Sequence, residues 1–132
     1  MKSCLIVDDS SVVRKVARRI LEDIDYIVDE AEDGQEAFDK CRQEMPDAIL
    51  LDWQMPSADG MEVTRRLRNE PDPALREVPV VLITAQSGPE NTAAGFAAGV
   101  TDYLTKPFRP AHVRARVQAW LLRRPAEAAR DT

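Results

Sequence analysis

The chain has 132 residues, 44% of them hydrophobic and 31% charged, which suits one soluble domain with a single core. It has no apolar run long enough to span a membrane and no signal-peptide pattern at its start, so we expect a cytoplasmic protein with no membrane partner. Its net charge of −5 argues against general nucleic-acid binding, and we therefore expect no DNA partner.

Apolar strand patterns and helical patterns alternate along the first half of the chain. Residues Ser3–Val7 form a short apolar run that predicts a buried strand. From Ser10 to Ile24 the apolar residues recur at helical spacing, which predicts an amphipathic helix. The next expected elements are a strand at Tyr26–Val28, a helix at Gly34–Glu44 that Pro46 ends, and a strand at Ala48–Leu51.

Prolines divide the second half of the chain. A helical pattern covers Met61–Leu67, and we expect a loop at Asn69–Val78 because this segment holds Pro71 and Pro73. The remaining expected elements are a strand at Val80–Ile83 after Pro79, a helix from Pro89 to Gly99, a strand at Asp102–Thr105, and a last helix marked by Val113, Val117, Trp120 and Leu121.

The pattern amounts to five β-α units in one domain, with residues 1–124 folded and residues 125–132 forming a flexible C-terminal tail. Continuously apolar strands that alternate with helices predict a parallel sheet covered on both faces. The fold class is therefore α/β, a single doubly wound (βα)5 domain. By analogy with flavodoxin-like folds of this size, we expect a five-stranded parallel sheet in the order 2-1-3-4-5.

In such a sheet, ligands bind beyond the carboxyl ends of the strands. Four of the expected strands are followed at this edge by candidate site residues, most of them polar. They are Asp8 and Asp9 after the first strand, Asp52 after the third, Thr84 and Ala85 after the fourth, and Lys106 and Pro107 after the fifth.

Each of these residues also has a structural explanation when taken alone. Asp8 or Asp9 could cap the first helix, Asp52 could cap the following turn, and Thr84 could be an ordinary β-branched strand residue. Lys106 could simply be solvated. The joint placement of all of them at one edge of the sheet favours a functional site.

Three convergent carboxylates repel one another and need a cation. Hard oxygen ligands with room for water and phosphate favour Mg²⁺, with Mn²⁺ as an alternative. Asp52 can then attack a phosphoryl group and form an aspartyl phosphate, a reaction that depends on positioning and charge neutralisation. The Lys106 ammonium would neutralise phosphoryl oxygens, the Thr84 hydroxyl would donate a hydrogen bond, and the small Ala85 would leave the approach open.

At these residues the chain resembles response-regulator receiver domains from Leu5 to about Leu122. The motifs are Val7-Asp8-Asp9-Ser10, Asp52-Trp53-Gln54-Met55-Pro56 with Gly60, Thr84-Ala85, and Lys106-Pro107-Phe108. Within the family the chain is most similar to CheY-type chemotaxis regulators. The residues that carry this closer similarity are Asp9-Ser10, Glu30-Ala31-Glu32-Asp33-Gly34, Asp52-Trp53, Ala98-Gly99 and Tyr103.

The resemblance implies a phosphorelay switch and not a true enzyme. Asp52 would take the phosphoryl group of a phosphohistidine, from a sensor histidine kinase or a histidine phosphotransfer protein. The resemblance implies that Mg²⁺ is held by Asp8, Asp9, Asp52 and the backbone carbonyl of Gln54. It also implies that Thr84, Ala85 and Lys106 bind the phosphoryl group, and that the Lys106-Pro107 peptide bond is cis.

The resemblance further implies how the signal leaves the domain. Thr84 would move toward the phosphoryl group, and Tyr103 would rotate inward to follow it. The face made by the Pro89–Gly99 helix, the Asp102–Thr105 strand and the last helix would then change its affinity for a downstream protein. The segment Gln86–Glu90 lacks the lysines that mark this face in regulators that bind the flagellar motor. We expect a monomer or weak dimer.

Positive charge gathers at the C-terminal end. From Lys106 onward there are seven Lys or Arg residues against two acids, Glu127 and Asp131. The last helix could therefore dock on an acidic surface or a phosphate-bearing ligand, although a solvated helix face explains the same charges. The arginines concerned are Arg109, Arg114, Arg116, Arg123 and Arg124.

Four alternatives remain beside a single-domain switch, which is expected because Pro125–Thr132 is too short to be an output domain. The chain could be a receiver cut from a longer regulator, or a receiver that only binds partners. A haloacid dehalogenase-type phosphohydrolase would need a second acid where Gln54 stands. A flavin carrier would not place Asp8 and Asp9 beside a flavin phosphate.

Cys4 and Cys41 are expected to be reduced, partly buried thiols.

Overall fold

The computed structural model describes residues 2–53, 55, 60–84, 89–105 and 109–119. Its five strands are all parallel and lie in the order β2-β1-β3-β4-β5, which confirms the predicted fold class and strand order. The strands are β1 (Ser3–Val7), β2 (Ile27–Ala31), β3 (Ala48–Asp52), β4 (Val80–Thr84) and β5 (Asp102–Thr105).

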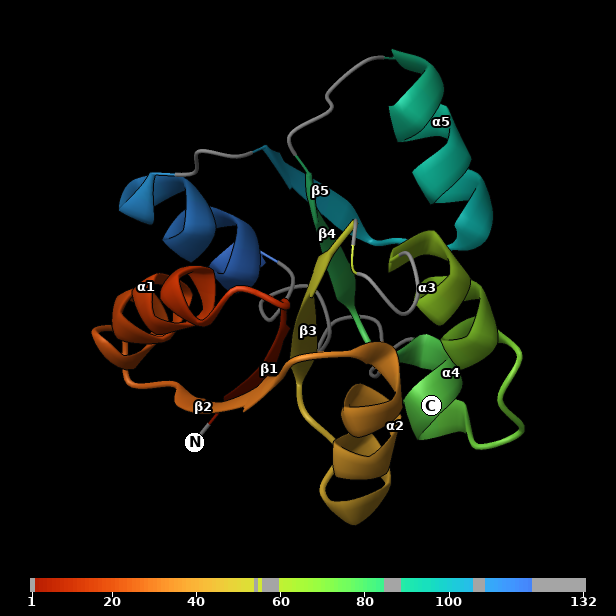
Figure 1. The fold of residues 1–132 in the computed structure, drawn as a ribbon, viewed down its shortest axis with the longest axis horizontal. Helices are drawn as coiled ribbons and strands as arrows, with labels where there is room; N and C mark the ends of the chain where they lie inside the picture. Colours follow the sequence, from red (N-terminus) through yellow and green to blue (C-terminus); the bar gives the residue numbers. More distant parts are fainter. Residues whose placement is uncertain (1, 54, 56–59, 85–88, 106–108, 120–132) are drawn as a thin grey trace.

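Helices cover both faces of the sheet (Figure 1). The labelled helices are α1 (Ser11–Glu22), α2 (Gly34–Gln43), α3 (Gly60–Arg68), α4 (Pro73–Glu77) and α5 (Pro89–Ala98). Residues 110–119 form a further helix, drawn in blue, which lies on the same side as α1. Helices α2, α3, α4 and α5 lie on the other side.

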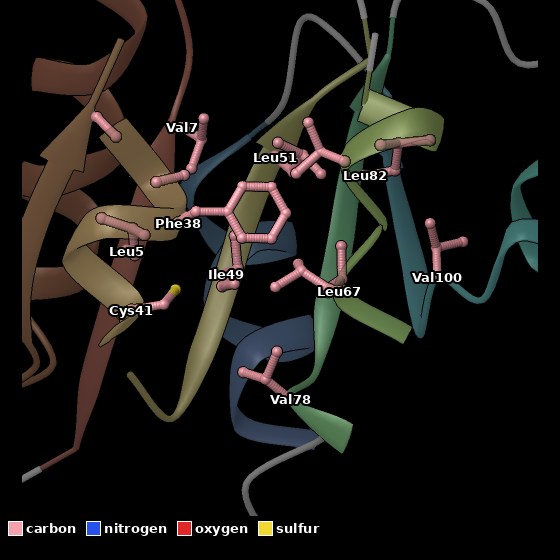
Figure 2. Packing of buried hydrophobic residues seen from close by; sticks show 14 of the residues in the cluster. Leu5, Val7, Phe38, Cys41, Ile49, Leu51, Leu67, Val78, Leu82 and Val100 are labelled. Carbon is pink, nitrogen blue, oxygen red and sulfur yellow. The ribbon is translucent and has the colours of Figure 1, made fainter. Parts of the chain in front are cut away.

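Alternating side chains of the strands build two separate cores, because successive residues of a strand point to opposite faces. Leu5 and Val7 of β1 join the cluster that α2, α3 and α4 cover. Cys4 and Ile6 join the cluster that α1 and residues 110–119 cover. Figure 2 shows the first cluster, with the Phe38 ring extending into it from α2. The two cores fix the sheet between its helices and hold the carboxyl ends of the strands in one row.

The prediction of a loop at Asn69–Val78 is wrong in part, because this segment contains the short helix α4. Asp72 caps the helix by accepting a hydrogen bond from the Ala74 N–H at 3.0 Å, and Pro73 occupies its first turn. A proline at the start of a helix loses no hydrogen bond and already has a helical φ angle. Leu75, buried in the first core, holds the helix against the domain.

Strand β2 starts one residue later and runs three residues further than the apolar segment Tyr26–Val28 that predicted it. The strand lies at the edge of the sheet, where Ile27 and Asp29 are exposed while Val28 and Ala31 are buried. The apolar run ends at Val28 because Asp29 and Glu30 follow it, whereas the pairing with β1 continues to Ala31. The extension brings Ala31 level with Val7 of β1.

Both cysteines are free, as predicted, and both are buried more completely than the partial burial expected. Burial raises the pKa of the Cys4 thiol to about 12 and that of Cys41 to about 11, so both are neutral and unreactive at physiological pH. In the part of the chain that the structure describes, no helix has the length and apolar character needed to cross a lipid bilayer. Trp120, Leu121 and the expected tail at 125–132 lie outside the described residues.

Candidate functional site

Three aspartates meet at the carboxyl ends of β1 and β3. Asp8, Asp9 and Asp52 each offer a carboxylate oxygen, and these oxygens lie within 4.8 Å of one another. The register brings Asp8 and Asp52 together, because Val7 pairs with Leu51 and each aspartate is the next residue along the chain. Asp9 follows Asp8 directly. Asp8 and Asp52 are buried, whereas Asp9 is exposed. The cluster is therefore open to solvent on the side of Asp9.

Asp8 and Asp9 do not cap the first helix. Ser10 is the N-cap of α1, and its hydroxyl accepts a hydrogen bond from the Val13 N–H at 3.3 Å. Asp8 instead accepts a hydrogen bond from the Ser10 N–H at 2.9 Å, which fixes the direction of its carboxylate. The helix-capping explanation for this acidic pair is therefore wrong, because Ser10 serves as the cap.

The acidic cluster fits a divalent cation. Two oxygens bound to one Mg²⁺ lie at most about 4.2 Å apart, twice the usual Mg–O distance. The carboxylate oxygens need to move by less than about 1 Å to meet that limit, since they already lie within 4.8 Å. Hard, charged oxygen ligands with an open side match the preference of Mg²⁺ for a few carboxylates together with water and phosphate.

Asp52 is held rigidly by its own strand. It is the last residue of β3 and pairs in register with Ile83 of β4, whose carbonyl accepts the Trp53 N–H at 2.8 Å. Thr84 is the next residue of β4 and is buried like Asp52. The sheet therefore places the hydroxyl-bearing residue on the strand beside Asp52, one position further along, as the strand order predicts.

Gly60 begins α3 directly behind Asp52. Its N–H donates to the Trp53 carbonyl at 2.6 Å. A Cβ atom at this position would lie 2.5 Å from the Asp52 carbonyl oxygen and 2.7 Å from Leu82 Cδ1. The sequence indicated Gly60 only as part of a motif, whereas the structure gives the reason: α3 approaches the strand too closely for a side chain.

Tyr103 of β5 lies between the site and the surface. Its ring is 6.3 Å from the ring of Trp53, the residue after Asp52, and 5.3 Å from that of Phe96 on α5. The side chain of Phe96 is half exposed. Burial raises the pKa of Tyr103, and a hydrogen bond with the Gly95 backbone partly offsets this rise. An aromatic row thus runs from beside Asp52 to the outer surface of α5.

Gly95 is a site residue that the sequence did not reveal. A Cβ atom on Gly95 would lie 1.5 Å from the Tyr103 hydroxyl oxygen and 2.5 Å from its Cζ. The hydroxyl therefore occupies the space that a side chain would fill, and α5 needs a glycine there for Tyr103 to hold this position. The contact between Gly95 and Tyr103 depends on how α5 packs against β5. No local sequence pattern predicts that packing.

Gly95→Ala is expected to displace the Tyr103 ring, because two Tyr103 atoms stand where the new methyl group must go. The chain has two tyrosines, so fluorotyrosine labelling with ¹⁹F NMR follows Tyr103 once the Tyr26 signal has been assigned with Tyr26→Phe. We expect the Tyr103 signal to move and the Tyr26 signal to stay.

The same substitution in a Tyr103→Ala background serves as the control. With the ring gone, alanine should stabilise α5 by about 1 kcal/mol relative to glycine, the ordinary difference in helix propensity. With Tyr103 present, this gain should be lost or reversed. Equal stabilisation in both backgrounds, with an unmoved Tyr103 signal, contradicts the contact.

The remaining predicted site residues lie outside the described part of the chain. They are Gln54, Ala85, Lys106 and Pro107. Their expected roles, including the cis peptide bond at Pro107, stay predictions.

A second group of acids, Glu32, Asp33 and Glu36, also has oxygens within 4.8 Å of one another. Its members serve the start of α2. Asp33 caps the helix by accepting from the Glu36 N–H at 2.8 Å, and Glu36 forms an ion pair with Lys40 at 3.3 Å. These contacts explain the group without a ligand.

Residues 4–118 match the sequence profile of the response regulator receiver domain. The chain belongs to this family. Its receiver fold, with an acidic cluster at the carboxyl ends of β1 and β3, agrees with that assignment. Receiver domains act in two-component systems, so the predicted family and class of signalling are confirmed.

Curated relatives of this receiver include transcriptional regulators. The chain is 42% identical over 123 residues to the transcriptional regulatory protein ResD of Bacillus subtilis, covering 93% of this chain and 49% of ResD. It is 43% identical over 120 residues to the response regulator MprA of Mycolicibacterium vanbaalenii, covering 91% of this chain and 50% of MprA. The chain therefore spans about half the length of these relatives.

Solved receiver structures resemble this one closely. The chemotaxis response regulator CheY4 of Vibrio cholerae has a TM-score of 0.84 at 33% identity, covering 90% of this chain and 98% of CheY4. The receiver domain of the Francisella response regulator 1452 has a TM-score of 0.85 at 29% identity, covering 93% of this chain and 98% of that domain. The receiver fold thus matches both a chemotaxis protein and another response regulator.

The comparisons correct one expectation. The prediction of no DNA partner rested on the charge of this chain, and it does not extend to longer proteins that share the domain. ResD is named a transcriptional regulator and is about twice as long as its matching segment. A receiver of this type can therefore belong to a protein that acts on transcription, whatever its own charge.

Proposed function

We propose that this receiver is a phosphorylation switch in which Asp52 is the phosphoacceptor. The observation that carries the proposal is the convergence of Asp8, Asp9 and Asp52, whose oxygens lie within 4.8 Å of one another at the carboxyl edge of the sheet. One of the three is the end of a buried central strand, which gives it a fixed direction of attack. The other two leave room for a cation.

The proposed reaction is the transfer of a phosphoryl group from a phosphohistidine on a histidine kinase or a histidine phosphotransfer protein. An Asp52 carboxylate oxygen forms a bond to phosphorus while the bond from phosphorus to the donor nitrogen breaks, and the imidazole nitrogen keeps that electron pair. A Mg²⁺ ion at the acidic cluster would neutralise charge on the phosphoryl oxygens. Thr84 and Lys106 are proposed to bind those oxygens. The domain is an acceptor in this scheme and not a general enzyme.

The proposed output is a change in the surface formed by α5, β5 and residues 110–119. Phosphorylation adds a double negative charge beside Thr84, and Tyr103 couples that change to α5 through its contacts with Phe96 and Gly95. Arg116, on the helix at 110–119, forms an ion pair with Asp102 of β5 at 3.1 Å. Polar and aromatic groups therefore lie together on the face that we propose a protein partner reads.

We further propose transcriptional control, and not chemotaxis, as the output of the protein that carries this receiver. The identity to ResD, 42%, exceeds the 33% identity to CheY4. The absence of lysines from Gln86–Glu90 points the same way, because motor-binding regulators carry them on this face. Reporter-gene assays and motility assays on a deletion strain separate the two outputs: a motility defect with unchanged transcript levels overturns this choice.

Trp53 provides the test of the switch itself. Its indole follows Asp52 directly, and the only other tryptophan of the chain is Trp120, so a Trp120→Phe variant isolates its signal. We expect the fluorescence of this variant to change with Mg²⁺, and again when a small phosphodonor such as acetyl phosphate is added.

An Asp52→Asn version of the same single-tryptophan variant is the control. It should lose the response to the phosphodonor and weaken the response to Mg²⁺, because one charged ligand has become neutral. The proposed function is overturned if the Trp120→Phe protein with Asp52 intact shows no change in Trp53 fluorescence up to millimolar Mg²⁺. Circular dichroism must show that this protein is folded.

A further inference from the structure

Arg14 of α1 reaches back to the acidic site. Its Nη1 donates a hydrogen bond to the main-chain carbonyl oxygen of Asp8 at 2.6 Å, and its Nε donates to Glu30 Oε1 at 3.0 Å. The Arg14 side chain is 16% exposed and the Glu30 side chain 25% exposed. This pair is shielded more than an ordinary surface ion pair, so its geometry is better defined.

The contact acts on Asp9 through the peptide bond. The Asp8 carbonyl and the Asp9 N–H belong to one planar peptide unit. A hydrogen bond that fixes the carbonyl therefore also fixes the orientation of the Asp9 main chain, from which its side chain extends. On its other side, Asp8 donates its own N–H to the Ala31 carbonyl at 3.1 Å. Asp8 is thus held from both sides, and Arg14 supplies the hold nearer to Asp9.

Glu30 keeps Arg14 in place and away from the carboxylates. Its second oxygen, Oε2, accepts a hydrogen bond from Arg18 Nε at 2.6 Å. Desolvation raises the pKa of Glu30, but the hydrogen bonds from Arg18 and Arg14 lower it to a net value below its usual range, so the carboxylate is ionised at neutral pH. Two arginines thus share one carboxylate, and only Arg14 also contacts the site.

Without this anchor, the guanidinium of Arg14 would have another partner nearby. The three aspartates form a concentrated negative charge, and a loose arginine close to them can pair with a carboxylate and compete with a cation. The bond to Glu30 directs the guanidinium toward the Asp8 main chain, where it orients the peptide without occupying a carboxylate.

We propose that Arg14 is a positioning residue for the cation site, which orients the Asp8–Asp9 peptide so that the Asp9 carboxylate faces Asp8 and Asp52. The proposal rests on the proposed function, because it assumes that the three aspartates bind Mg²⁺. It goes beyond that function by assigning a role to a residue of α1 that contributes no ligand atom.

The test measures Mg²⁺ affinity from Trp53 fluorescence in the Trp120→Phe protein. Arg14→Ala removes both the charge and the bond to Asp8, whereas Arg14→Lys keeps the charge but loses the fixed fork of the guanidinium. We expect both variants to bind Mg²⁺ at least about fivefold more weakly, which corresponds to a loss of about 1 kcal/mol. Arg18→Ala is the matched control, because Arg18 binds the same Glu30 without touching Asp8, and it should stay within about twofold of wild type.

A second measurement reads the geometry without the metal. In ¹⁵N NMR spectra of Mg²⁺-free protein, the Asp9 amide signal should shift in both Arg14 variants and remain in place in Arg18→Ala. A loss of thermal stability with unchanged Mg²⁺ affinity and an unmoved Asp9 signal would leave Arg14 a purely structural role and overturn the proposal.

Three other outcomes are also decisive. Tighter Mg²⁺ binding in Arg14→Ala with no change in Arg14→Lys shows that Arg14 acts by charge alone, which overturns positioning. If the wild-type site shows no Mg²⁺ response, the proposed function and this inference both fail. If the wild type responds and the Arg14 variants respond equally, only this inference fails.

Discussion

Asp52→Asn is expected to abolish phosphoryl uptake, leave the fold intact and raise the midpoint of thermal unfolding in Mg²⁺-free buffer. At the 4.8 Å limit of the cluster, two unit charges repel by about 3–4 kcal/mol for an effective dielectric constant of 20. Solvent at the exposed Asp9 screens part of this repulsion, so we expect a gain of about 1–2 kcal/mol when one charge is removed. Thermal unfolding followed by circular dichroism measures this gain.

With Mg²⁺ present, the wild type should become more stable than Asp52→Asn, the reverse of the order in Mg²⁺-free buffer. A ligand that binds only the folded state stabilises it by about 2.7 kcal/mol at a hundred times its dissociation constant. We expect this gain in the wild type and a much smaller one in Asp52→Asn. Glu32→Gln, in the acidic group at the start of α2, is the control and should behave as wild type. Equal Mg²⁺ stabilisation of all three proteins contradicts a cation site at Asp52.

Gly60→Ala should produce the largest loss of stability among the substitutions near the site. The new methyl group would lie 2.5 Å from the Asp52 carbonyl oxygen, 2.7 Å from Leu82 Cδ1 and 3.1 Å from the Trp53 Cα atom. Two of these are main-chain atoms of the central segment, which cannot give way as a flexible side chain would. We expect a loss of about 2–3 kcal/mol, as for other overpacked positions, measured by urea unfolding.

Gly60→Ala should also impair the reaction at Asp52, because relief of the clash must move either α3 or the end of β3. Mg²⁺ affinity and phosphoryl uptake should therefore both fall in the fraction that remains folded. Ala74→Gly in α4, far from the site, provides a control of modest destabilisation with normal Mg²⁺ affinity. A Gly60→Ala protein with wild-type stability would show that α3 lies further from β3 than the structure has it.

The sequence was sufficient to predict the sheet and the acidic triad. Strands β1, β3 and β4 each contain an uninterrupted apolar run, so the pattern along the chain predicts their positions and carboxyl ends, and with them the placement of Asp8, Asp9 and Asp52. The expected strand order came by analogy, and the structure confirms it. Once the order is known, the convergence of three carboxylates follows from the register.

The errors arose where one pattern has two structural meanings. Pro73 is typical of a loop, but a proline after the N-cap Asp72 also begins a helix. The apolar run ends at Val28, although β2 continues through the exposed Asp29 and the half-buried Glu30 to Ala31, as an edge strand can. A local pattern cannot decide between these meanings, because the decision depends on what packs against the segment.

Two residues of the site could not be found from sequence patterns. Arg14 belongs to the polar side of an amphipathic helix, and its bond to Glu30 spans 16 residues. Gly95 lies in an alanine-rich helix, and only the placement of Tyr103 gives it a role. Both act by contact between elements that the fold brings together, which is information that a single sequence does not carry.

Mass spectrometry shows whether Asp52 accepts a phosphoryl group in a Mg²⁺-dependent reaction. The protein is treated with acetyl phosphate with and without Mg²⁺, and the modified residue is located by reductive trapping of the acyl phosphate and peptide mapping. We expect the intact protein to gain the mass of one phosphoryl group only with Mg²⁺, and trapping to occur at Asp52. Phosphorylation that persists in Asp52→Asn, or a trapped residue other than Asp52, contradicts this expectation.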